Sequence, residues 1–426
     1  MNHYTNIRIK KRSLTEILSL YIFILPFCLS FLMDFIGINS VIKYSIDVVW
    51  VGLFALLVFR KQSLIEKKIF SFVVFIISWL LYVFIVYLFK YQSVFYFLWG
   101  LRNNFRFYAA FILFATFFDE TTADDCFKLM DILFFINAVV SFVQFFALGY
   151  KQDYLGGIFG VGRGCNAYSI VFFSIIVARS ILLFLSAKEY AIICFLKCAI
   201  SLVLSAMAEL KFFFVIFIFI LAIAMFITKV FWKKVIALSV IAILLMFSSS
   251  ILTEIFGKTE KLTLQRIFEL ITAQNYSSAE DLGRFTAIPT ISNTVLKTPL
   301  ERIFGMGLGN CDTSTFAICN STFYQLHESL HYTWFSSAFI FLETGYVGLI
   351  INLLFFSFSF FLACKQYKRD GANQLYCQLT IIMSILCVVL TFYNSVLRTE
   401  IAYVVFFVLA LPLMQNKKTT IEKFNL

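Results

Sequence analysis

The sequence predicts an all-α polytopic membrane protein with about 12 transmembrane helices and a large extracytoplasmic loop between helices 9 and 10. Three observations predict this class: 61% of the 426 residues are apolar, only 14% are charged, and the mean hydropathy is +0.89. Soluble domains are roughly 45–50% apolar and about 25% charged. This chain has too few polar side chains to cover a water-facing surface, which excludes soluble, disordered, coiled-coil and disulfide-scaffold classes.

Twelve apolar segments are long enough to cross a bilayer, which takes roughly 20 residues. They cover residues 14–36, 41–59, 69–89, 101–118, 129–149, 167–187, 189–208, 210–228, 235–256, 332–363, 375–396 and 400–414. The first follows a basic stretch, but it is too long for a signal peptide and is expected to be an anchor. The chain therefore divides into transmembrane helices 1–9 (residues 1–256), the large loop (257–331), and transmembrane helices 10–12 with a cytoplasmic tail (332–426).

Lysine and arginine predict the orientation, because they gather on cytoplasmic loops. With the N-terminus inside, about 19 of the 35 basic residues fall on the inner side. An even number of spans then places both termini in the cytoplasm. One inner loop is an exception, since it holds Asp119, Glu120, Asp124 and Asp125 beside a single Lys128. Topology thus accounts for the net charge of +11, and no nucleic-acid partner is expected.

The large loop, residues 257–331, is expected to be functional, because a loop of this length without a role is uncommon. Residues 259–274 have apolar side chains near helical spacing, which predicts an amphipathic helix on the membrane surface. The later glycine turn, Gly305–Gly309, is not a nucleotide fingerprint, because no strand precedes it. Cys311 and Cys319 share the loop, and their pairing as a disulfide stays open; the other cysteines are expected to pack as small core residues.

A few basic side chains are expected on the outer side, where each needs a partner or a function. They are Arg102 and Arg106 at the start of span four, Arg163 in a glycine-rich loop, Lys211 before span eight, and Arg284 in the large loop. Each one alone is equally well explained by snorkelling to the lipid headgroups. Together they predict a cationic basin for an anionic ligand, because guanidinium groups bind phosphate oxygens with two hydrogen bonds.

Two of the three histidines end the loop, in the sequence His327-Glu328-Ser329-Leu330-His331. This matches H-E-x-x-H, a pattern that places two zinc ligands on one helix face with a glutamate base between them. The pattern fixes only three positions, and the spacing singles out no third ligand. Two alternatives stay open: an imidazole that acts as a general base near neutral pH, and a histidine that only caps a helix.

Three stretches resemble the O-antigen polymerase and O-antigen ligase superfamily, the Wzy-type polymerases and their ligase relatives. They are Gly283-Arg284 through Thr298-Pro299-Leu300 to the turn Gly305–Asn310, then His331 followed by Glu343-Thr344-Gly345-Tyr346-Val347-Gly348, and Gly160 to Asn166 before span six. Their order and the twelve-span layout match the family, although the motifs are specific only over residues 283–349. The chain departs from the family twice: Trp334 stands where histidine is frequent, and Lys211 where ligase relatives tend to have arginine.

The resemblance implies a polymerase of polyprenyl-pyrophosphate-linked oligosaccharide repeat units, which makes O-antigen or a related surface polysaccharide. Glycosyl transfer would occur on the outer side of the bacterial cytoplasmic (inner) membrane, with pyrophosphate as the leaving group and without a metal or another cofactor. The resemblance implies that Arg284, Arg163 and Lys211 stabilise the leaving group and that His331 is the base. The further residues expected in the site are Glu328 and His327 as less favoured bases, and Arg102, Arg106, Asn166 and Asn310 as substrate-binding residues.

Three other functions stay open. An O-antigen ligase, which transfers the glycan to the lipid A core, shares the same motifs. An intramembrane zinc metalloprotease would use His327, Glu328 and His331, and a lipid-linked oligosaccharide flippase would require inverted repeats and broken helices. The expected partners are the lipid-linked oligosaccharide and the lipid bilayer, and a chain-length regulator protein is left open.

Overall fold

The computed structural model describes residues 12–59, 67–228, 281–369 and 373–414, with isolated residues between 232 and 243. Regular structure in this part of the chain is helical, and it contains no strand. The expected span 235–256, the amphipathic helix expected at residues 259–274 and both chain ends lie outside the described residues.

Helices lie at eleven of the twelve expected apolar segments. They are α1 (Leu14–Ile36), α2 (Ser45–Phe59), α3 (Lys67–Lys90), α4 (Val94–Phe117), α5 (Glu120–Phe146), α6 (Asn166–Leu185), α7 (Ala191–Met207), α8 (Lys211–Ile227), α14 (Ser336–Tyr367), α15 (Gln374–Tyr393) and α16 (Ala402–Ala410). The shorter α11 (Ala287–Thr294), α12 (Pro299–Phe304) and α13 (Thr322–His327) belong to the region of the large loop. Seven helical segments are long and apolar enough to cross a bilayer, which agrees with a membrane-embedded protein of the expected all-α class.

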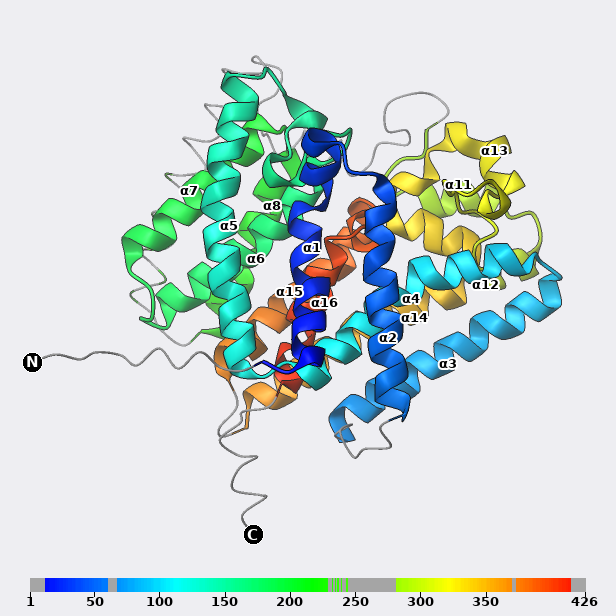
Figure 1. Ribbon diagram of the computed structural model, residues 1–426, viewed down its shortest axis with the longest axis horizontal. Coiled ribbons are helices and arrows are strands. Elements are labelled where there is room, and N and C mark those ends of the chain that lie inside the picture. Colours follow the sequence, from blue (N-terminus) through cyan, green and yellow to red (C-terminus); the bar gives the residue numbers. More distant parts are fainter. Residues whose placement is uncertain are drawn as a thin grey trace, which may run out of the picture.

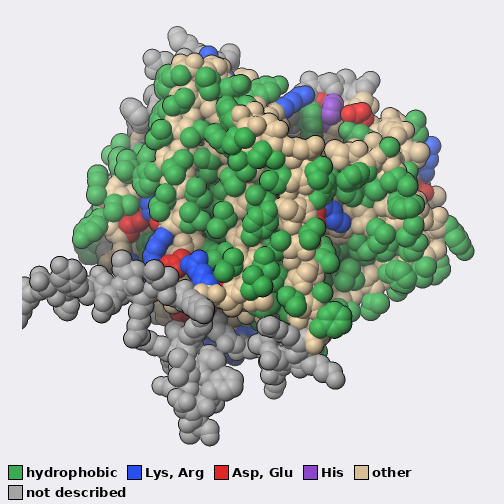
Figure 2. All heavy atoms as spheres, in the orientation of Figure 1, with side chains coloured by type: hydrophobic (Ala, Val, Ile, Leu, Met, Phe, Trp, Pro, Cys, Tyr) green, Lys and Arg blue, Asp and Glu red, His purple; other side chains and the backbone are tan. Residues whose placement is uncertain are grey.

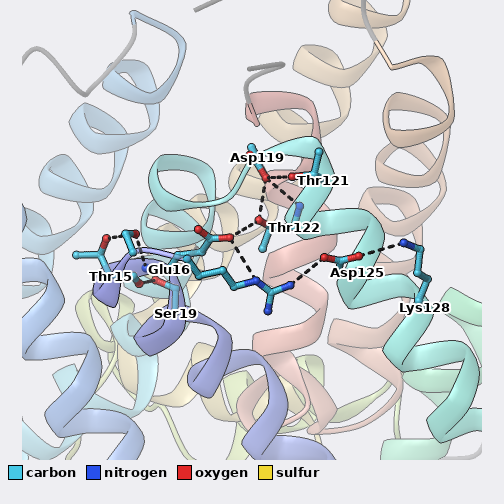
Figure 3. A network of polar contacts seen from close by, with 10 residues as sticks. Thr15, Glu16, Ser19, Asp119, Thr121, Thr122, Asp125 and Lys128 are labelled. Carbon is cyan, nitrogen blue, oxygen red and sulfur yellow. Dashed lines mark hydrogen bonds and ion pairs between the residues drawn. The ribbon is translucent and has the colours of Figure 1, made fainter. Parts of the chain in front are cut away.

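The helix α5 begins at Glu120 rather than near residue 129, because its first turns are polar. Asp119 caps it by accepting a hydrogen bond from the backbone N–H of Thr122 (2.9 Å), and the Thr122 hydroxyl donates to buried Glu16 of α1 (2.6 Å). Arg12 pairs with Asp125 at 2.8 Å in the same network, which Figure 3 shows between α1 and α5. The acidic stretch that was expected to depart from the charge rule therefore includes a helix cap and joins two helices.

The core of the bundle is formed around α16, which lies among α1, α4, α14 and α15 in Figure 1. Every residue from Ala402 to Leu411 is at most 2% exposed, as expected for a helix that is apolar on all faces. Outer helices also expose large apolar side chains, such as Leu81 (57%) and Ile85 (50%) of α3. Hydrophobic side chains cover most of the face shown in Figure 2. Continuous apolar surface of this kind indicates contact with lipid.

Residues 281–335 pack at one end of the bundle, which we call the loop face and whose helices α11, α12 and α13 lie at the right and upper right of Figure 1. Their small core includes Ile291 and Tyr332 and is shared with the first half of α14, around Phe339. Cys311 is buried in it and Cys319 is half-buried, and both are free thiols, so the disulfide left open above is not formed. The loop region thus rests on α14 as a packed unit.

Candidate functional site

A cavity of about 540 Å³ opens at the loop face. Arg163 and Asn166 line it from the segment between α5 and α6, and Arg284 and Trp334 line it from the loop region. The remaining lining residues come from α1, the first turns of α6, the turn before α8, and the end of α15 with the segment that follows it. Cys165 also lines the cavity, but burial raises the pKa of its thiol to about 12, so it is not a nucleophile at neutral pH.

The loop that carries Arg163 is held from inside the bundle by two amides of α5. Gln144 donates to the carbonyl of Gly157 (2.9 Å) and accepts from the N–H of the same residue (2.7 Å). Asn137 accepts from the N–H of Ile158 (2.9 Å). Both amides are buried, and they satisfy backbone groups that would otherwise be unpaired among apolar helices. Two amides seven residues apart in an apolar span were a signal that sequence reasoning missed.

Asp34, near the end of α1, holds the next part of the same loop. Its carboxylate accepts from the N–H groups of Val161 (2.7 Å) and Gly162 (3.0 Å). Gly160 has φ +89°, and a Cβ there would lie 2.2 Å from the Asp34 carboxylate. The glycines therefore permit the close approach that anchors the backbone beside Arg163.

Arg163 and Arg284 both lie against aromatic rings that line the cavity. The Arg163 guanidinium carbon is 5.7 Å from the centre of the Trp334 ring, and that of Arg284 is 4.2 Å from Tyr393. Tyr393 also stacks on Phe212 at 4.0 Å. Such a contact engages the flat face of a guanidinium rather than its N–H edges. Arg163 is exposed and forms no ion pair within the described ranges.

His331 lies directly behind the cavity wall, because its ring stacks on Trp334 at 4.0 Å. Its Nδ1 atom is 2.6 Å from the carboxylate of Asp281, which is 1% exposed. The backbone of His331 is in the left-handed region (φ 50°), which is unusual for a residue with a side chain. This sharp turn brings the side chains of His331 and Trp334 together, and 37% of the His331 side chain stays exposed.

The zinc hypothesis does not fit the geometry of residues 327–331. The helix α13 ends at His327, a 3-10 turn covers Glu328–Leu330, and His331 is left-handed, so the two imidazoles do not share a helix face. His327 stacks on Phe323 at 4.5 Å, and Glu328 accepts from the hydroxyl of Tyr324 (2.9 Å). In the part of the chain that the structure describes, no three His, Cys, Asp or Glu side chains are grouped as metal ligands.

No family model and no curated protein sequence matches the chain. The geometry of the cavity therefore carries the functional argument. Of the ten predicted site residues, Arg163, Asn166 and Arg284 line the cavity and His331 lies one ring behind it. The other six make contacts elsewhere.

Two of the predicted cations are neutralised by carboxylates. Arg102 donates to Asp47 from two nitrogens (2.7 and 2.9 Å), and the pair joins α4 to α2. Lys211 pairs with Glu209 at 2.9 Å, and of these two residues Glu209 lines the cavity. Arg163 and Arg284 are the predicted cations that line the cavity, where the carboxylates of Asp34, Asp153 and Glu209 also lie.

Arg106 is buried and acts on the cavity only through a neighbour. It donates to Glu400 (3.3 Å), and the second oxygen of Glu400 accepts from the hydroxyl of Tyr168 (3.0 Å), a lining residue. Arg106, expected as a substrate-binding residue, is thus engaged in an internal ion pair.

The two predicted asparagines differ in position. Asn166 lines the cavity and donates to the carbonyl of Ala208 (3.1 Å), which ties the start of α6 to the end of α7. Asn310 instead donates to the carbonyl of Met306 (2.6 Å) and closes the glycine turn, away from the cavity. Asn310 is therefore a turn residue in the structure.

The glycine turn fills a break in α14. Gly345 has φ +63°, which interrupts the helix, and Gly307 donates to the freed carbonyl of Glu343 (2.9 Å). The Glu343 carboxylate accepts from the N–H of Gly309 (2.8 Å), and a Cβ on Gly345 would lie 2.3 Å from the carbonyl of Ile303. Two motifs of the resemblance, the glycine turn and the Glu-x-Gly segment, thus form one packing unit. The irregular backbone at the break in α14 is tolerated because surrounding protein groups satisfy its hydrogen bonds.

Replacing Gly309 with alanine is expected to destabilise the fold by about 3 kcal/mol or more. An added Cβ would lie 1.8 Å from the carbonyl of Tyr96 in α4, and φ is +85°, so a clash adds to the left-handed strain. Gly164→Ala is the matched control, because φ is +83° and a Cβ there meets nothing within 4 Å. Thermal unfolding in detergent measures both. If both variants lose the same thermal stability, the predicted clash between residue 309 and Tyr96 is absent.

Proposed function

We propose that the protein is a metal-independent glycosyltransferase that polymerises polyprenyl-pyrophosphate-linked oligosaccharide repeat units, as the O-antigen polymerases do. The observation that carries the proposal is the cavity at the loop face, where Arg163 and Arg284 converge from distant parts of the chain. Trp334 joins them to His331, a base candidate held by a buried carboxylate. A lipid-linked anionic substrate matches this combination of apolar helices and a cavity that two arginines line, beside the carboxylates of Asp34, Asp153 and Glu209.

The two arginines suit a pyrophosphate leaving group. Negative charge develops on the bridging oxygen as the bond to the sugar breaks, and preformed N–H donors stabilise it without reorganisation. The guanidinium groups of Arg163 and Arg284 are already oriented by Trp334 and Tyr393. We infer that they bind the two phosphates and that the polyprenyl chain extends along the apolar helices.

The reaction then requires one base. A hydroxyl oxygen of the acceptor sugar attacks the anomeric carbon of the donor, and the bond from that carbon to the pyrophosphate breaks. The polyprenyl pyrophosphate leaves with the electron pair, and the hydroxyl proton passes to Nε2 of His331. General-base catalysis of this kind contributes about 10²–10⁴-fold to a rate.

The charge distribution supports an outer location of the cavity. The end opposite the loop face holds the starts of α1 and α5, on the side where about 19 of the 35 basic residues are expected, with the acidic stretch from Asp119 to Asp125 as the exception. Because basic residues gather on the cytoplasmic side, we infer that the loop face is outside the bacterial cytoplasmic membrane, that both termini are inside, and that the chain crosses twelve times. Glycan precursors would then meet the enzyme in the outer leaflet.

Purified protein in vesicles, supplied with a polyprenyl-pyrophosphate-linked oligosaccharide, tests the proposal. We expect a ladder of longer chains and one polyprenyl pyrophosphate released for each bond formed. A single transfer to a lipid A core acceptor without a ladder would overturn polymerase in favour of the ligase. Movement of the substrate across the bilayer without bond formation, or proteolysis that requires zinc, would overturn glycosyl transfer altogether.

A further inference from the structure

Asp281 has no step in the reaction proposed above, although it contacts the base candidate His331. It stands two residues before the Gly283-Arg284 motif, and its carboxylate is buried at 1% exposure. The carboxylate lies 2.6 Å from Nδ1 of His331, fifty residues later in the chain. The backbone holds the two segments together, because the N–H of Leu282 donates to the carbonyl of Leu330 (3.2 Å). A buried charged group is costly unless it is well paired, so this contact is a defined feature of the fold.

The contact determines which nitrogen of His331 can accept a proton. A carboxylate only accepts hydrogen bonds, so its partner nitrogen, Nδ1, must carry the hydrogen. The neutral imidazole then has its lone pair on Nε2, at the far side of the ring from Asp281. In water the opposite tautomer, with the hydrogen on Nε2, is the commoner one. Without Asp281 the ring would therefore often present a donor where a base is needed.

Two further features keep the ring in one orientation. Trp334 stacks on it at 4.0 Å, with 21° between the ring planes. The left-handed backbone of His331 is strained for a residue with a side chain, and strain of this kind persists where surrounding structure holds it in place. The nearby Glu328 is engaged by the Tyr324 hydroxyl and Arg163 lies at the Trp334 ring, so among the described residues Asp281 is the carboxylate that contacts this imidazole.

We propose that Asp281 is a positioning residue, which holds His331 as the Nδ1–H tautomer and aims Nε2 toward the cavity. This inference rests on the proposed function, in which His331 takes the proton of the acceptor hydroxyl. The competing explanation is that Asp281 only fastens the start of the loop region to residues 330–331. The two explanations differ in what an isosteric amide does, because an amide can donate to Nδ1 as well as accept from it.

Asp281→Asn is the test, with Glu301→Gln as the matched control. Glu301 is a carboxylate of the loop region that caps α12, and glutamine also serves in such a cap. For Asp281→Asn we expect kcat to fall about 10²-fold with KM within about 3-fold of wild type. We expect the control to keep wild-type kcat and KM. A rise in KM with unchanged kcat, or wild-type kcat in Asp281→Asn, would overturn the positioning role.

A spectroscopic readout separates tautomer control from mere fastening. The chain has three histidines, so ¹⁵N-histidine labelling gives three imidazole spin systems. The system that disappears in His331→Asn is that of His331. At a pH where the imidazoles are neutral, we expect His331 to be the Nδ1–H form in the wild type and the Nε2–H form in Asp281→Asn. The same tautomer in both proteins would overturn the proposal. If His331→Asn still polymerises normally, the base assignment fails; if it is inactive while Asp281→Asn is normal, only the role of Asp281 fails.

Discussion

Replacing His331 with asparagine is expected to lower the kcat of polymerisation by about 10²–10⁴-fold while the protein folds normally. Asparagine tolerates the left-handed backbone that His331 adopts (φ 50°), which alanine does not. The substitution thus removes the imidazole without adding strain, and a loss of chain growth reports on chemistry. Polymer length and released polyprenyl pyrophosphate are measured together, beside thermal unfolding.

Tyr91→Asn is the matched control for this variant. Tyr91 is also left-handed (φ 46°), and its side chain is 95% exposed in the turn between α3 and α4. The same change there is expected to leave polymerisation at the wild-type rate. If His331→Asn keeps more than about a tenth of the wild-type kcat, His331 is not the base, because a base contributes at least about 10²-fold.

Much of the fold could be predicted because the signal is local. A run of about 20 apolar residues is a helix in any membrane context, so α1 was predicted with the observed bounds, Leu14–Ile36. The start of α5 was predicted nine residues too late, because hydropathy does not register a polar first turn. There the capping side chain of Asp119 and its neighbours determine where the helix begins.

The site was predictable only in part, for a physical reason. Charged residues in an apolar chain are conspicuous, so Arg163 and Arg284 could be named from the sequence. Whether a charge is already neutralised depends on a residue from a distant part of the chain. The ion pair of Arg106 with Glu400 therefore could not be predicted from local sequence. The same holds for Asp281, since a carboxylate in a polar loop has no local pattern that indicates its histidine.

The aromatic partners of the arginines were missed for a related reason. The chain is 19% aromatic, so one more tryptophan or tyrosine carries no signal by itself. Only the folded chain brings Trp334 to Arg163 and Tyr393 to Arg284. Each ring comes from an element other than the one that carries its arginine, which makes the cavity depend on the loop region and the bundle together.

Replacing both Arg163 and Arg284 with lysine is expected to lower kcat/KM by about 10³-fold although no charge is removed. Each guanidinium lies on an aromatic ring of the cavity and can offer two parallel N–H groups to a phosphate. An ammonium group is a compact point charge that neither stacks as a plane nor binds in this paired way. Losing a single preorganised donor typically costs about 10²–10³-fold, and the two positions act on one leaving group.

Polymerisation kinetics and direct binding of polyprenyl pyrophosphate, measured on the same protein in vesicles, decide the outcome. Arg302→Lys is the matched control, because Arg302 lies on α12 and donates to the carbonyl of Leu296 outside the cavity. It is expected to keep wild-type kinetics. Since charge is conserved in both proteins, a double variant within about threefold of wild type would mean that long-range attraction suffices, and that the planar, ring-supported geometry of Arg163 and Arg284 is not what the leaving group requires.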